Sequence, residues 1–95
     1  MYALELRKMR ITAIKNLTRK DVPIYYRRIF SGIVVIDLLN DLIESTIDFT
    51  VETKPTGVNE VIINEMGTVD YPLLPLTKEI KKFISVLDET GGLPA

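Results

Sequence analysis

The sequence predicts an α+β protein: an antiparallel β-sheet of about four strands with one C-terminal amphipathic helix packed on one face. Three observations predict this fold. β-branched and aromatic residues dominate the stretch 22–39, polar and apolar residues alternate along 45–53, and an apolar stripe with helical spacing fills 76–87. The segments between predicted strands are too short to hold a crossover helix, so neighbouring strands are expected to pair antiparallel.

The stretch Val22–Leu39 organises the rest of the chain. With a period of two, one of its faces is apolar except at Arg28 and Gly32, and the other face is mixed. It is therefore predicted to be one long strand, or two strands joined at Ser31-Gly32. A buried helix over 30–43 is the main alternative, although its β-branched residues favour a strand.

The remaining strands are expected at residues 9–17, 45–53 and 58–66. Asn40-Asp41 has the side chains of a turn. The sequence KPTG at 54–57 contains Pro and Gly, which are typical of turns, and therefore predicts an antiparallel hairpin between the last two strands.

The C-terminal helix is predicted over 75–90, because Pro is favoured in a first helical turn and Gly91-Gly92 can cap the end. Apolar residues form the stripe that would pack on the sheet: Leu76, Ile80, Phe83, Ile84 and Leu87. The chain, 1–95, is expected to be a single domain, with the sheet in 9–66 and residues 1–8 as a frayed leader.

Composition excludes several chemistries. The 95 residues include no cysteine and no histidine, so disulfides, thiolate nucleophiles, an imidazole base and the usual zinc ligands are excluded. Carboxylates remain, and both of their groupings have simpler explanations: Asp37, Asp41 and Glu44 as a solvated acidic edge, and Asp48 with Glu52 as the wet face of a strand. We therefore predict no catalytic residue, no metal site and no cofactor, and a protein that is not an enzyme.

The sequence also gives no reason to expect a membrane partner. No apolar run approaches the roughly 20 residues that span a bilayer. The first residues lack the apolar region of a secretory signal. A cytoplasmic location is therefore expected.

The net charge of −1 conceals a strong asymmetry. Residues 1–36 hold eight basic residues against two acids, a balance of +6, and residues 37–95 hold four lysines against eleven acids, a balance of −7. Such a split predicts either a basic surface for a polyanion or two halves that pair with each other.

The stretch Tyr25-Tyr26-Arg27-Arg28 is the main functional candidate. Aromatic rings beside arginines on a strand can stack on bases while the guanidinium groups contact phosphate, as in proteins that bind single strands. The sequence therefore predicts a non-catalytic module that binds single-stranded DNA or RNA. Its expected nucleic-acid-binding residues are Lys15, Arg19, Lys20, Tyr25, Arg27 and Arg28.

Two alternatives stay open. In the first, the arginines pair with acids of neighbouring strands, such as Asp37, Asp48 or Glu52. In the second, the chain is a small interaction or assembly subunit that homo-oligomerises through its basic and acidic halves. Because a helix covers only one face of a sheet, apolar residues on the other face of the long strand also favour homodimerisation: Tyr25, Ile29, Ile33 and Val35.

Overall fold

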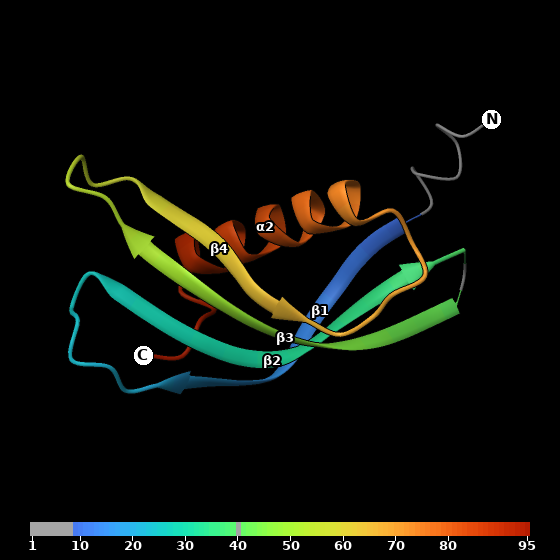
Figure 1. Cartoon of the computed structure of the whole chain (residues 1–95), viewed down its shortest axis with the longest axis horizontal. Helices are drawn as coiled ribbons and strands as arrows, with labels where there is room; N and C mark the ends of the chain where they lie inside the picture. The colour runs from blue at the N-terminus through green and yellow to red at the C-terminus, as the bar shows by residue number, and fades with distance from the viewer. Residues whose placement is uncertain (1–8, 40) are drawn as a thin grey trace.

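The computed structural model describes residues 9–39 and 41–95. Four antiparallel strands form one sheet in the order β1-β2-β3-β4, and they span Met9–Lys20, Arg27–Leu38, Asp41–Thr53 and Asn59–Met66. Helix α2 (Leu73–Glu89) follows β4, runs back in the opposite direction and lies over one face of the twisted sheet (Figure 1). The predicted fold class is confirmed.

The core lies between α2 and one face of the sheet, called here the inner face. On β2, Phe30, Val34 and Ile36 all point to this face and are fully buried. The register of β2 with β3 sets Phe30 opposite Phe49, and their rings stack with centroids 5.2 Å apart. The helix closes the core with its buried residues Leu76, Ile80 and Ile84.

The periodicity of the organising stretch therefore predicts the inner face correctly. The alternative of a buried helix over 30–43 is wrong, because β2 and β3 occupy this region as extended strands. β2 also passes through Ser31 and Gly32 without a break, so a joint between two strands at that point is excluded.

The ends of the elements differ from the predicted ones. β1 continues to Lys20, whereas the stretch before Arg27 is the connection to β2 and not strand. Pro23 explains this, because it has no N–H to donate to a ladder. The backbone N–H of Arg27 then donates to the carbonyl of Ile24 (3.2 Å), which closes a turn just before β2 begins.

β3 begins at Asp41 and α2 at Leu73, four and two residues earlier than predicted. Leu39 has a φ of 53°, so the chain reverses tightly between β2 and β3 and both strands continue to the reversal. Pro75 still lies in the first turn of α2. The predicted leader at 1–8 and the predicted turn role of Asn40 lie outside the described residues.

Gly32 interrupts the apolar face for a steric reason. Opposite it, the pairing of β1 with β2 is irregular between Lys15 and Thr18, and Asn16 has a φ of 55°. This irregularity brings Ile14 and Leu17 over Gly32, where a Cβ atom would lie 3.0 Å from Ile14 Cγ2 and 3.2 Å from Leu17 Cδ2. The glycine therefore provides the space that the bulged β1 fills.

We expect Gly32→Ala to lower the free energy of unfolding by about 1–3 kcal/mol, because the added methyl group would overpack this contact. Its Cβ would also lie 3.2 Å from the carbonyl oxygen of Lys15, which is backbone and cannot rotate away. Urea denaturation followed by circular dichroism measures the change. The neighbouring Ser31→Ala is the control, and an equal effect of both variants would contradict the steric explanation.

Candidate interaction surfaces

The two arginines of the basic-aromatic cluster lie on opposite faces of the sheet, and each contacts an acid. Arg27 lies on the outer face, away from the helix, and its Nε donates to Glu52 Oε1 (3.2 Å). Arg28 lies on the inner face, where its guanidinium donates to both carboxylate oxygens of Asp88 at 2.8 and 3.3 Å. Neither arginine is free to contact a phosphate in this arrangement.

Asp88 joins three elements at the C-terminal end of α2. Besides the two bonds from Arg28 on β2, its Oδ2 accepts a hydrogen bond from Asn59 Nδ2 at the start of β4 (2.8 Å). Hydrogen bonding by Arg28 is the main cause that lowers the pKa of Asp88, and Asn59 contributes to it against the opposing effect of burial. The site therefore acts as a latch between the helix and the sheet.

Ion pairs use up much of the charge asymmetry inside the chain. Four of them join a basic residue of the first 36 to an acid of the remainder: Arg10–Asp37, Lys15–Glu44, Arg27–Glu52 and Arg28–Asp88. The two halves of opposite charge therefore pair within one molecule. The pair of Arg27 with Glu52 is one that neighbouring strands led us to expect, whereas Asp88 on the helix was missed.

The other predicted binding residues lie near the end of β1 and in the connection that follows it. Arg19 and Lys20 form no ion pair with the described part of the chain. Tyr25 is 96% exposed and meets the ring of Tyr26 edge-on, with centroids 5.8 Å apart. The six residues of the predicted site are thus divided among two sheet faces and one connection.

The acidic groupings are arranged for ion pairing. Asp37 and Glu44 contact Arg10 and Lys15, respectively. The hydrogen bond from Arg27 is the main cause that lowers the pKa of Glu52. Within residues 9–39 and 41–95, no group of three or more acids is placed to hold a metal ion, and no helix is long and apolar enough to cross a membrane.

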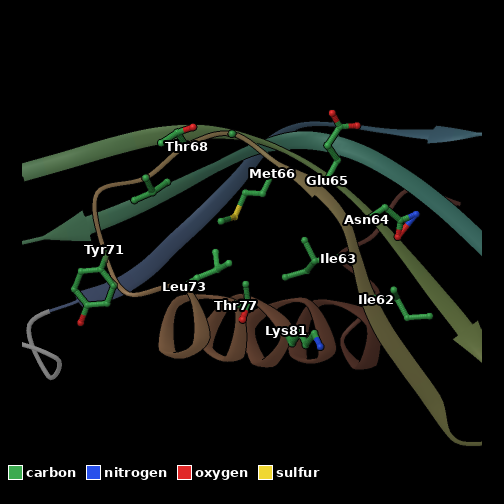
Figure 2. A pocket seen from close by; sticks show the side chains of 12 residues that line it. Ile62, Ile63, Asn64, Glu65, Met66, Thr68, Tyr71, Leu73, Thr77 and Lys81 are labelled. Carbon is green, nitrogen blue, oxygen red and sulfur yellow. The ribbon is translucent and has the colours of Figure 1, made fainter.

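A groove of about 580 Å³ opens between β4 and the N-terminal half of α2. Figure 2 shows Ile63 and Met66 pointing into it from β4, and Leu73 and Thr77 from the helix. Leu73 is 62% exposed and Leu74 beside it is 82% exposed, so a partly apolar surface surrounds the opening. The sequence analysis did not find this groove.

The groove borders the free edge of β4, which is the last strand of the sheet. The N–H of Lys54 donates to the carbonyl of Val58 (2.8 Å), and bonded residues then alternate along the antiparallel pair. Glu60 and Ile62 therefore turn their backbone groups to β3. By the same alternation, Asn59, Val61 and Ile63 turn their N–H and C=O groups to the free edge.

Over residues 6–89, the sequence of this chain matches the model of a protein family that is named after a gene locus. That name states neither an activity nor a ligand. No curated protein matches the chain, and no solved structure matches it.

We expect Asp88→Asn to lower the free energy of unfolding at neutral pH by about 1–3 kcal/mol, because it weakens a charged, partly buried hydrogen-bonded pair. The pKa of Asp88 is depressed in the folded protein, so the stabilisation is present above the pKa of the unfolded chain. It is lost as the pH falls through the lower pKa of the folded state. Urea denaturation from pH 7 downward should therefore show the two proteins converging.

Glu89→Gln is the matched control, because Glu89 is the exposed acid next in sequence. It should leave the stability nearly unchanged. If Asp88→Asn and Glu89→Gln had equal effects at every pH, the latch would have no measurable role.

Proposed function

The chain belongs to this locus-named family, and we propose that it is a non-catalytic protein-interaction module that binds its partner along β4. The observation that carries this proposal is the juxtaposition of a free strand edge with an apolar groove. A free edge supplies hydrogen bonds to an added strand, and a groove beside it accepts the alternate side chains of that strand. Since the chain has no cysteine to protect or pair, we place this module in the cytoplasm.

The two edges of the sheet differ in a way that supports this assignment. β1 is irregular at two places in its pairing, and Lys15, Arg19 and Lys20 add charge along it. Irregularity and lysine are common protections against unwanted strand pairing. β4 pairs regularly from Asn59 to Ile63 and has a single irregularity beyond this segment. An unprotected, regular edge is expected where a partner strand adds.

The ion pairs also favour recognition through backbone and apolar groups. Because Arg10, Lys15, Arg27 and Arg28 already contact acids of the same chain, a partner cannot use them without breaking these pairs. The exposed apolar residues Leu73 and Leu74 have no such constraint. Complementary charge is therefore assigned to the fold, and assembly to β4 and the groove.

Photo-crosslinking tests the module without knowledge of its partner. A photoreactive phenylalanine derivative replaces Leu73, at the mouth of the groove, and the protein is expressed in its native cells. We expect a discrete crosslinked protein product, identified by mass spectrometry. Leu42 is the control, since it is 69% exposed but belongs to β3 and does not line the groove. Absence of any product specific to Leu73 would contradict the proposal.

Binding of single-stranded nucleic acid is the second candidate function. It is favoured by one specific observation: the almost fully exposed Tyr25 follows Arg19 and Lys20, which form no ion pair with other described residues. A ring that projects into solvent can stack on a base, and the two cations can contact phosphates. The candidate surface is thus smaller than the sequence predicts.

Fluorescence anisotropy with labelled single-stranded DNA and RNA, measured over a salt series, tests this second function. We expect the double variant Arg19→Ala/Lys20→Ala to weaken binding and to reduce the slope of log K against log salt by about 0.7 for each cation removed. Lys78→Ala/Lys81→Ala on α2 removes the same charge and should keep the slope. No binding at low salt would dismiss this candidate.

A further inference from the structure

We propose that the partner at β4 is a second copy of this chain, and that the two β4 strands pair antiparallel about a two-fold axis at Ile62. This inference rests on the proposed function, because it names the occupant of the same edge and groove. It joins two four-stranded sheets into one continuous sheet with both helices on the same face. Three features of β4 support it: the backbone, the side chains opposite one another, and the surfaces that become continuous.

The backbone groups of β4 are compatible with this axis. In an antiparallel pair, residues that direct their N–H and C=O groups to the edge must face residues that do the same. With the axis at Ile62, Val61 of one copy faces Ile63 of the other, and both direct their backbone groups to the edge. A shift of the register by one residue would place edge-directed groups opposite groups that already bond to β3.

The side chains of β4 are also complementary in this register. Val61 faces Ile63 on the inner side, and Ile62 faces Ile62 on the outer side. Glu60 faces Asn64 of the second copy, so that no carboxylate lies directly opposite another carboxylate. An axis at Val61 would instead set Glu60 opposite Ile62, which is a poorer cross-strand pair.

The same arrangement continues two surfaces of the monomer. On the inner side, Val61 of the second copy would extend the apolar floor that Ile63 and Met66 form in the groove (Figure 2). On the outer side, Ile62 is 36% exposed and ends a row that runs across the sheet through Ile29 and buried Thr50. Contact between the two copies of Ile62 would cover this end of the row.

A disulfide can report this geometry, because the chain contains no cysteine of its own. Ile62 would form a pair without hydrogen bonds on the axis, where Cα atoms lie about 4.5 Å apart, a separation within the range that a disulfide spans. We expect purified Ile62→Cys to become mainly a disulfide-linked dimer under mild oxidation. Non-reducing electrophoresis measures the dimer fraction over time.

Glu60→Cys is the matched control, since it lies two residues away on the same face of β4. In the proposed register the two copies of residue 60 are offset by four residues, about 13 Å along the strand, which a disulfide cannot span. Glu60→Cys should therefore remain monomeric under the same oxidation. Equal dimer fractions for the two variants, or no dimer with Ile62→Cys, would overturn the inference.

Sedimentation of the cysteine-free protein gives an independent measurement. We expect a concentration-dependent dimer that Ile62→Lys dissociates, because two ammonium groups would meet on the axis, and that Thr46→Lys on the outer face of β3 leaves intact. Circular dichroism confirms that both variants are folded. A monomer at every concentration overturns the second copy as partner. Crosslinking from Leu73 to a different protein would still support the interaction module.

Discussion

The register between β2 and β3 is the constraint on which the rest of the structure depends. It sets Phe30 opposite Phe49 on the face that the helix covers. Because side chains alternate, the same register sets Arg27 opposite Glu52 on the outer face. A slip of one residue would turn the buried apolar residues outward and separate the ion pair at the same time. Core packing and charge pairing therefore specify a single alignment together.

This constraint explains how much of the fold could be predicted. A period of two is a local property, so the buried face of β2 could be predicted from its own residues. The ends of the strands depend on their neighbours. β1 reaches Lys20 because β2 continues to pair with it, and β3 reaches back to Asp41 because the reversal at Leu39 is tight. Periodicity carries no information about either of these contacts.

The site shows the same division between local and distant information. Alternation predicted that Arg27 and Arg28 point to opposite faces, and the pair of Arg27 with Glu52 followed from strand neighbours. Asp88 could not be identified, because it lies 60 residues from Arg28 and meets it only after the helix packs. The groove has no motif either, since β4 and α2 form it together. A weak signal existed: in a sheet of consecutive hairpins, the last strand is an edge.

One helix on a twisted four-stranded sheet cannot protect the whole sheet, and the molecule solves this problem unequally. The irregular pairing and positive charges of β1 interfere with strand addition at its edge. β4 lacks comparable irregularity over Asn59–Ile63, although an unprotected edge risks aggregation. Occupation of this edge in the functional state removes that risk and also uses its backbone groups. The unequal protection of the two edges is therefore the physical reason to assign recognition to β4.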